Sequence, residues 1–224
     1  MSVRKFLLTF TIIVIILTSS AASRTSRQPK SSYDIIIAGG GTGGISAAIQ
    51  AARMGVSVLV VESSTWIGGQ ATAAGVSTMD DMSRQMSGIY EEFINRIKSY
   101  YDSRGKSMGT CYWYTGSRAF EPRIGQEAFI SMINEARRRG TLEFLMNSEI
   151  TGVNMSKRAV TGVTVRTPSG NRSYGCKVLI DATEYGDILP ITKTPYRAGN
   201  STSKFLNPDA MIQDITDRKS TRLN

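Results

Sequence analysis

Residues 33–62 read YDIIIAGGGTGGISAAIQAARMGVSVLVVE, and this segment sets the expected architecture of the chain. Residues 33–38 are almost continuously apolar, which is typical of a parallel strand that is buried on both faces. The alanine-rich residues 45–54 predict a helix that stops at Gly55, and residues 56–61 predict a second buried strand. We therefore expect a strand–helix–strand unit, the building block of α/β folds.

The turn between the first strand and the helix carries glycines with G-x-G-x-x-G spacing: Gly39, Gly41 and Gly44. In this pattern the first glycine permits a tight turn, the second lets the backbone approach a pyrophosphate, and the third lets the helix pack on the strand. The free N–H groups at the helix N-terminus also attract phosphate. Glu62 ends the second strand 18 residues after Gly44, close to where a ribose-binding acid is expected. This context predicts a dinucleotide site, whereas a glycine-rich turn in an unrelated α/β fold leaves Glu62 unexplained.

A second glycine segment, WIGGQATAAG, covers residues 66–75 and includes Gly68 and Gly69. Small residues follow these glycines, so the backbone stays open to a close neighbour. A flat ring system lying against the segment would account for this composition. A plain flexible loop accounts for it equally well.

The middle of the chain predicts two helices and an irregular stretch between them. Apolar residues recur at helical spacing over residues 83–101 and again over residues 126–139. Residues 102–123 are irregular and contain Tyr112, Trp113, Tyr114, Arg118 and Arg123. This cluster could line a substrate pocket that accepts an anion, with Tyr114, Arg118 and Arg123 as contacts. A hydrophobic seam that carries surface arginines is the simpler interpretation.

Strands dominate the sequence after residue 140. Residues 141–146 predict one strand, and residues 149–153, 159–166 and 172–180 predict a meander of antiparallel strands. The last strand runs into VLIDATEYGD, residues 178–187, in which an apolar run ends in an acid and small residues.

Composition excludes several classes of function. The 224 residues contain 27 Lys and Arg against 18 Asp and Glu, and eight of the basic residues lie in residues 1–30 and 218–224, which contain no acid. The remaining 19 basic and 18 acidic residues nearly balance, so we expect no nucleic-acid partner. The chain has no histidine, which excludes Ser-His-Asp triads and histidine-ligated metals within it, and we predict no metal site.

The two cysteines, Cys111 and Cys176, are far apart in the sequence and form no C-x-x-C pair. They could form a disulfide in an oxidising compartment. Two isolated buried thiols are the favoured interpretation.

Residues 1–23 have the features of an export signal: Arg4 and Lys5 at the start, an apolar core over residues 6–17, and small residues at 20–22. The apolar core is shorter than the roughly 20 residues that span a bilayer. We therefore expect a periplasmic or secreted protein with no stable membrane span after cleavage, and residues 24–32 as a polar linker. A membrane anchor formed by residues 6–22 is the alternative.

The whole arrangement resembles the FAD-dependent oxidoreductase family, the glutathione-reductase-like flavoproteins that include xanthan-lyase-like proteins. The resemblance rests on IIIAGGGTGGISAAIQAARMGVSVLVVE, WIGGQATAAG, VLIDATEYGDILPI, PYRAG and MIQDIT, and it covers about residues 33–216. It implies an α/β fold: a Rossmann-like FAD-binding domain with a parallel sheet and an inserted antiparallel β-meander.

The resemblance also implies FAD as the cofactor and a set of contacts. The first glycine turn would hold the pyrophosphate, Glu62 the adenosine ribose, the second glycine segment the ribityl and flavin portion, and residue 150 the adenine. The segment after the last strand would form the second cofactor contact. The implied contacts are Gly39, Gly41, Thr42, Gly43, Gly44, Glu62, Ser63, Gly68, Gly69, Gln70, Ile150, Asp181, Ala182, Thr183, Gly186 and Asp187.

The resemblance favours an enzyme that passes a hydride or an electron pair between an unidentified small-molecule substrate and flavin. An NAD-dependent dehydrogenase is the first alternative, which Glu62 allows and the meander disfavours. The absence of a cysteine pair argues against disulfide reductase chemistry, and the absence of histidine rules out a histidyl-linked flavin within this chain. The sequence identifies no catalytic residue.

The family's proteins are considerably longer than this chain, which stops soon after MIQDIT. The substrate region is expected to start at about residues 82–125. Residues 217–224, DRKSTRLN, break the family pattern and are expected to be an artefact of a truncated gene model. A truncated, non-catalytic dinucleotide-binding fragment is therefore the second alternative.

Overall fold

The structure, a computed structural model, describes residues 30–79, 86–110 and 118–196. The expected signal peptide, Tyr114, Cys111 and the expected artefactual tail lie outside these residues. The elements in chain order are β1 (Ser32–Ala38), α2 (Thr42–Arg53), β2 (Val58–Val61), η1 (Gly69–Ala71), β3 (Thr78–Met79), α3 (Gly88–Asp102), β4 (Arg118–Ala119), α4 (Pro122–Ala136), β5 (Leu142–Leu145), β6 (Glu149–Ser156), β7 (Ala159–Thr167), β8 (Gly170–Asp181) and α5 (Ile188–Ile191).

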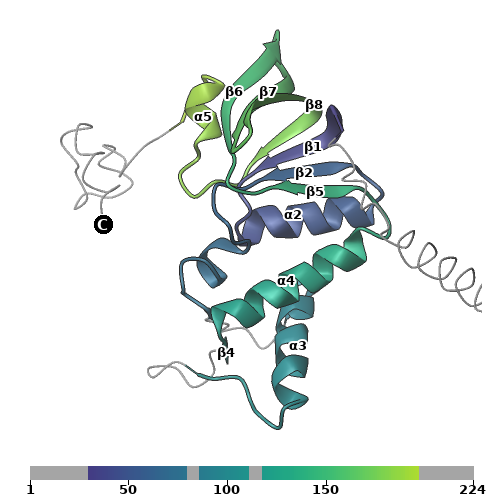
Figure 1. Cartoon of the computed structure of the whole chain (residues 1–224), viewed down its shortest axis with the longest axis vertical. Coiled ribbons are helices and arrows are strands. Elements are labelled where there is room, and N and C mark those ends of the chain that lie inside the picture. Colours follow the sequence, from purple (N-terminus) through teal and green to yellow (C-terminus); the bar gives the residue numbers. More distant parts are fainter. Residues whose placement is uncertain (1–29, 80–85, 111–117, 197–224) are drawn as a thin grey trace, which may run out of the picture. The chain divides into compact units, whose positions relative to one another are not determined.

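The main element is a six-stranded sheet with strand order β5-β2-β1-β8-β7-β6 (Figure 1). Strand β1 pairs in parallel with β2 on one side and with β8 on the other, and β2 pairs in parallel with β5. Strands β6, β7 and β8 pair antiparallel. The predicted α/β class, the parallel sheet and the meander are confirmed.

Strand β8 belongs to both parts of the sheet. Residues 170–175 pair with β7, and residues 175–181 pair with β1 as far as the partners Ala38 and Asp181. The meander therefore continues the parallel sheet through one long strand, where the sequence predicted an insertion. Gly162 of β7 pairs with Gly175, the residue of β8 at which pairing with β7 ends and pairing with β1 begins. A Cβ on Gly162 would approach the backbone oxygen of Tyr174 to 2.6 Å, so the strands come close together at this point. Sequence periodicity does not predict this backbone contact.

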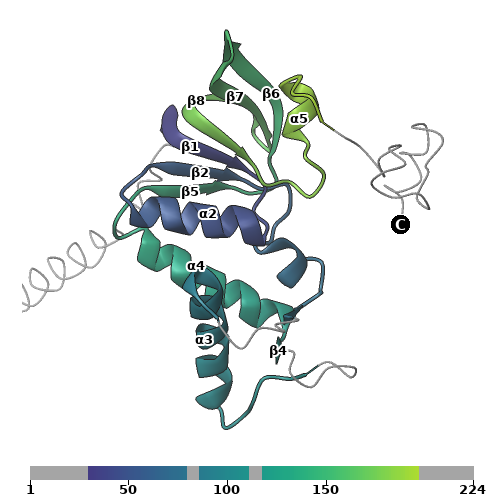
Figure 2. The same cartoon turned by 180° about the vertical axis from the view of Figure 1, so that it is seen from behind.

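The helices form layers against one face of the sheet. Helix α2 packs on β2, α4 packs on α2, and α3 packs on α4 (Figures 1 and 2). Helix α2 begins at Thr42, earlier than the predicted residue 45, because the glycine turn closes within Gly39–Gly41. Helix α4 begins at Pro122, inside the stretch predicted to be irregular, because proline is well suited to the first turn of a helix. That stretch also contains β4.

Buried side chains form a core on each side of the sheet. The first core lies among the sheet, α2, α3 and α4, and Phe93 of α3 stacks on Phe129 of α4 with ring centroids 4.2 Å apart. The second core lies between the other face of the sheet, the meander and α5, and includes Ile36, Leu59 and Val163. Because both faces are covered, all four residues of β2 are buried, as its continuous apolar run predicts.

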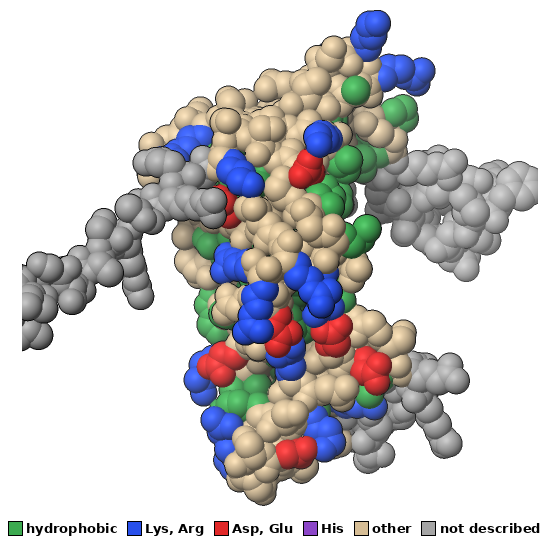
Figure 3. All heavy atoms as spheres, turned by 90° about the vertical axis from the view of Figure 1, so that its right-hand side faces the viewer, with side chains coloured by type: hydrophobic (Ala, Val, Ile, Leu, Met, Phe, Trp, Pro, Cys, Tyr) green, Lys and Arg blue, Asp and Glu red, His purple; other side chains and the backbone are tan. Residues whose placement is uncertain are grey.

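Charged side chains of both signs are interspersed on the face drawn in Figure 3. Two ion pairs link neighbouring helices: Arg53 of α2 with Glu92 of α3, and Arg96 of α3 with Glu135 of α4.

Candidate cofactor site

The first glycine turn brings β1, α2 and the loop after β8 together. Gly39 has φ +92°, a left-handed conformation that favours glycine, and a Cβ there would lie 2.4 Å from the backbone oxygen of Ala182. A Cβ on Gly44 would lie 2.1 Å from the backbone oxygen of Gly39, so α2 packs directly on the turn. A Cβ on Gly41 would contact only the carboxylate of Glu184, at 3.4 Å. Gly39 thus occupies a tight turn and Gly44 allows close packing of α2, as their spacing predicts. Gly41 presents bare main chain, and its contact with a pyrophosphate stays a prediction.

The second glycine segment packs against the first. The N–H of Gly68 donates to the backbone oxygen of Gly40 at 2.7 Å, and a Cβ on Gly69 would lie 2.9 Å from the Cα of Gly41. Gly68 also has φ +101°, and a Cβ there would collide with the side chain of Thr72 at 2.7 Å. These contacts within the chain account for the two glycines, and a flat ring system lying against the segment stays a prediction.

The carboxylate of Glu62 is fixed at the end of β2. Its Oε2 accepts a hydrogen bond from the N–H of Gly40 at 2.6 Å, and its Oε1 accepts one from the N–H of Ser64 at 2.7 Å. Oε1 also accepts a long hydrogen bond from the Ser63 hydroxyl at 3.5 Å, whereas Oε2 accepts only the one from Gly40 and can accept a second from a hydroxyl group. Glu62 therefore supports the glycine turn and also presents an acceptor to a ribose.

The DATEYGD segment folds around the carboxylate of Asp181. Its Oδ1 accepts from the N–H of Thr183 at 3.1 Å and from the Thr183 hydroxyl at 2.7 Å, and its Oδ2 accepts from the N–H of Ile188 at 3.1 Å. The Thr183 hydroxyl in turn accepts from the N–H of Asp187 at 2.8 Å. Asp181 thus shapes the loop that leads to α5, and residues that follow it reach the cleft.

These segments enclose a cleft of about 720 Å³, within the range of small-molecule sites. It lies at the carboxyl ends of β1 and β8, where the connections run to opposite sides of the sheet; ligands of α/β folds bind at such a point. The lining residues are Ala38, Gly39, Gly41, Val61, Glu62, Ser63, Ser64, Gly69, Gln70, Ala73, Ala74, Ser148, Glu149, Ile150, Ala182, Thr183, Glu184, Tyr185, Asp187 and Ile188.

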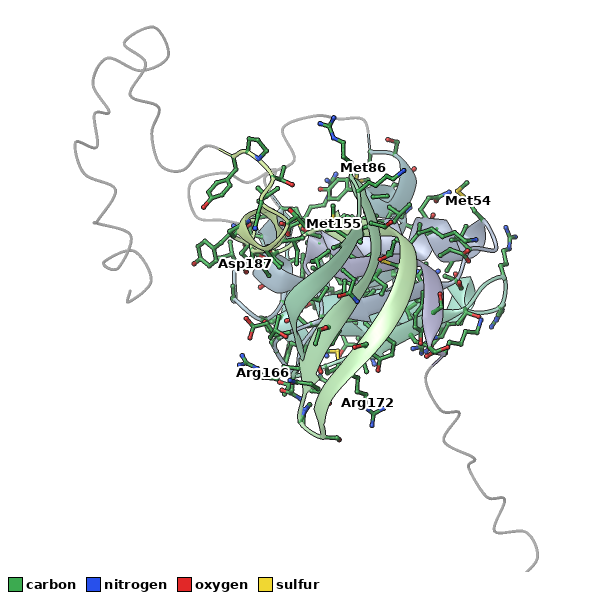
Figure 4. All side chains as sticks on the ribbon, turned by 90° about the horizontal axis from the view of Figure 1, so that it is seen from above. Met54, Met86, Met155, Arg166, Arg172 and Asp187 are labelled. Atoms are coloured by element: carbon green, nitrogen blue, oxygen red, sulfur yellow. The ribbon has the colours of Figure 1, made fainter. Side chains whose placement is uncertain are left out.

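Helix α2 directs its positive end at this cleft. Its N-cap is Gly41, no side chain caps the first turn, and no acidic residue lies in that turn. Figure 4 shows Asp187, which lines the cleft, and Met54, which follows the other end of α2, on opposite sides of the molecule. Bare main chain, an uncapped helix N-terminus and a ribose-type acid together fit a nucleotide diphosphate.

Residues 34–223 match the family of FAD dependent oxidoreductases. The chain belongs to this family. The predicted resemblance and the predicted cofactor, FAD, are therefore confirmed. The family match also favours the FAD interpretation of the sequence over an NAD-dependent dehydrogenase.

Several solved structures are similar to this chain. The chain is 14% identical to an aromatic hydroxylase of angucycline biosynthesis, CabE, with a TM-score of 0.51, covering 76% of this chain and 35% of that one. It is 14% identical to an L-proline dehydrogenase from P. horikoshii, with a TM-score of 0.49, covering 75% of this chain and 58% of that one. It is 15% identical to a glycine oxidase from Bacillus cereus, with a TM-score of 0.42, covering 69% of this chain and 56% of that one. This chain thus spans less than two thirds of the length of each of these three structures. No curated protein matches its sequence.

The structure brings ten of the predicted contacts together in the cleft lining. These are Gly39, Gly41, Glu62, Ser63, Gly69, Gln70, Ile150, Ala182, Thr183 and Asp187. Of the others, Thr42 and Gly43 are exposed in the first turn of α2, Gly44 is buried beneath the turn, and Gly68, Asp181 and Gly186 shape the loops behind the lining. Their contacts with FAD stay predictions.

Sequence reasoning missed several lining residues. Glu184 and Tyr185 lie inside the quoted DATEYGD segment, and Ala73 and Ala74 lie inside the small-residue run, so both motifs pointed at them. Ser148 had no such signal. It reaches the cleft because its N–H donates to the backbone oxygen of Glu62 at 2.9 Å, next to the pairing of β2 with β5.

Of the suggested substrate contacts, Arg118 and Arg123 lie within the described residues, and neither is at the cleft. Arg123 pairs with Glu127 on the exposed surface of α4, and neither Arg123 nor Arg118 lines the cleft. For Arg123 this agrees with the simpler interpretation, a surface arginine.

Cys176 is a buried free thiol, and its burial raises its pKa.

The described ranges 30–79, 86–110 and 118–196 contain no group of three or more His, Cys, Asp or Glu side chains that could hold a metal ion. They also contain no helix with the length and apolar character needed to cross a membrane.

Proposed function

We propose that this chain provides the FAD-binding domain of an exported oxidoreductase that moves a hydride or an electron pair between a small-molecule substrate and flavin. The observation that carries the proposal is the cleft itself. Bare backbone of two glycine segments meets the N-terminus of α2 on one side and the carboxylate of Glu62 on another. The family match supports flavin as the group held there.

Bound FAD would supply the redox chemistry, and the residues of this chain would hold and orient it. The N–H groups of the first turn of α2 would bind the pyrophosphate, because the helix N-terminus favours negative charge. Glu62 would accept hydrogen bonds from the adenosine ribose, and its charge would repel a 2′-phosphate. The segments at residues 69–74 and 182–188 would flank the remainder of the cofactor.

The test is the visible spectrum of the purified full-length protein, with the released cofactor identified by mass. A flavin band and released FAD are expected. The Gly41→Val variant should lose the band, because a branched side chain would project from bare main chain at the cleft. The Gly152→Val variant on β6 is the matched control: a Cβ there would make only an ordinary contact with Thr164 at 3.5 Å, and Gly152 does not line the cleft, so its flavin should remain. Protein without flavin after reconstitution with FAD, or with tightly bound NAD instead, would refute the proposal.

The export part of the proposal depends on the sequence of residues 1–23 alone. Fractionation of the native host followed by N-terminal sequencing tests it. A mature protein that begins near residue 23 in the extracytoplasmic fraction is expected. Full-length protein held in the membrane fraction would favour the anchor of residues 6–22.

A further inference from the structure

The carboxylate of Glu184 lies against both glycine segments. Its Oε1 is 3.4 Å from the point that a Cβ on Gly41 would occupy and 3.1 Å from the corresponding point at Gly69. Both glycines line the cleft, as does Glu184. The carboxylate therefore occupies space that the two segments keep free of other side chains.

The same space has the electrostatic character of an anion site. Helix α2 starts directly after Gly41, and its N-cap makes no side-chain hydrogen bond. A negative group beside such an N-terminus is stabilised by the helix dipole. Glu184 thus lies where the N-terminus of α2 would attract either a carboxylate or a phosphate.

Glu184 is also free to move. It is an exposed residue, and within the described part of the chain no hydrogen bond or ion pair holds its carboxylate. The neighbouring Gly186 has φ +70°, and the fixed points of the loop are the bonds to Asp181 rather than any bond to Glu184. The side chain can therefore rotate away without breaking the loop.

We propose that Glu184 is a displaceable anionic residue that competes with the diphosphate of FAD for the first glycine turn and thereby sets cofactor affinity. Two negative groups repel each other in one small space, so binding a diphosphate requires the carboxylate to leave. The proposal rests on the proposed function, because it assumes that the cleft admits FAD. It adds a residue that opposes binding.

If Glu184 helped to bind FAD, removal of its carboxylate would change FAD affinity in the opposite direction. If the carboxylate of Glu184 instead accepted hydrogen bonds from cofactor hydroxyls, its removal would weaken FAD binding. Because the competition involves charge, it should affect only ligands that carry phosphate at this position. ADP and adenosine separate these cases, since they differ in the diphosphate alone.

The experiment measures dissociation constants of FAD, ADP and adenosine for the apo full chain and for Glu184→Gln. A helix N-terminus stabilises a nearby charge by about 0.3–1 kcal/mol, which corresponds to about two- to fivefold in affinity. Glu184→Gln should therefore bind FAD and ADP about two- to fivefold more tightly and adenosine unchanged. The gain should shrink as salt is raised, because salt screens exposed charges.

Glu91→Gln on α3 is the matched control, since it removes the same charge from an exposed helix position that does not line the cleft. Its affinities should equal those of the unmodified chain, and thermal melts should show both variants folded. Equal gains in FAD affinity in the two variants would overturn the proposed role of Glu184, as would unchanged or weaker FAD binding by Glu184→Gln. Either result would leave the proposed function standing. Failure of every variant to bind FAD and ADP would overturn the proposed function and this inference together.

Discussion

At the scale of single residues, the closest packing in the site is between Gly44 and the backbone oxygen of Gly39. A Cβ on Gly44 would lie 2.1 Å from that oxygen, and backbone cannot move aside as a flexible side chain can. Gly43, the preceding residue, has nothing within 4 Å of a Cβ. Two adjacent helical glycines therefore differ completely in what they tolerate.

Gly44→Ala should destabilise the chain by about 1–3 kcal/mol or more, because it overpacks a contact with main chain. Gly43→Ala should be neutral or stabilise by up to about 1 kcal/mol, since alanine is the better helix former. Urea unfolding of the two variants in the apo state measures both effects. Equal stabilities would show that Gly44 does not set the distance between α2 and the turn.

At the scale of elements, Asp34 in the amino-terminal half of β1 links that strand to Lys177, in the carboxyl-terminal half of β8, and to Ser57, which precedes β2. Its Oδ1 accepts from Lys177 of β8 at 2.6 Å, and its Oδ2 accepts from the N–H and hydroxyl of Ser57, at 3.0 and 2.5 Å. The hydrogen bonds from Lys177 and Ser57 hold the pKa of Asp34 well below its usual range.

A depressed folded-state pKa means that the unfolded chain takes up the proton first as the pH falls. The stabilisation from Asp34 should therefore be complete above about pH 4, the ordinary pKa of aspartate, and should be lost progressively below it. Asp34→Asn should be less stable than the unmodified chain at pH 6, and the two stabilities should converge toward pH 2. Chemical denaturation at several pH values measures the difference. A difference that stays constant with pH would contradict the role given to the carboxylate.

The layer of α3 on α4 combines an apolar contact with an ion pair, and the apolar contact should dominate. Phe93 is almost fully buried, stacks on Phe129 and meets the edge of Phe120 at 5.6 Å between centroids. Phe93→Ala should cost about 3–5 kcal/mol, because it leaves a cavity. Glu135→Gln removes the ion pair with Arg96. Both side chains of this pair are partly exposed, so the variant should lose at most about 1 kcal/mol of folding stability. Urea unfolding of both variants tests this, and comparable losses would contradict it.

At the scale of the whole molecule, the cleft is built from segments that are distant in the sequence. Its lining runs from Ala38 to Ile188 and draws on the ends of β1, β2 and β8, the second glycine segment and the start of β6. A ligand that contacts all of them binds only the folded chain. Cofactor binding should therefore stabilise the entire described unit.

FAD at a hundred times its dissociation constant should add about 2.7 kcal/mol of stability. For a chain of this size that corresponds to a rise of about 5–10 °C in the melting temperature. Differential scanning calorimetry with and without FAD measures the shift. Riboflavin, which lacks the adenosine diphosphate, is the control and should produce a smaller shift. No shift at saturating FAD would contradict FAD binding in the cleft.

Local patterns in the sequence determined the elements and the chemistry of the glycine turn. Short-range rules suffice there, because the apolar run of β1, the spacing of Gly39, Gly41 and Gly44, and the acid at the end of β2 lie within thirty residues. The antiparallel meander followed from alternation and turn residues in the same way. The sequence also led to FAD, through motifs whose order matched a known family.

Only the tertiary structure decided what depends on distant segments meeting. β8 joins the meander to the parallel sheet, Gly68 and Gly69 pack on the first glycine turn, and Ser148 enters the cleft through strand pairing. The carboxylate of Glu184 reaches the same turn although more than 140 residues separate it from Gly41. Periodicity and spacing report neighbours along the chain. Backbone contacts between segments appear only when the sheet has set their register.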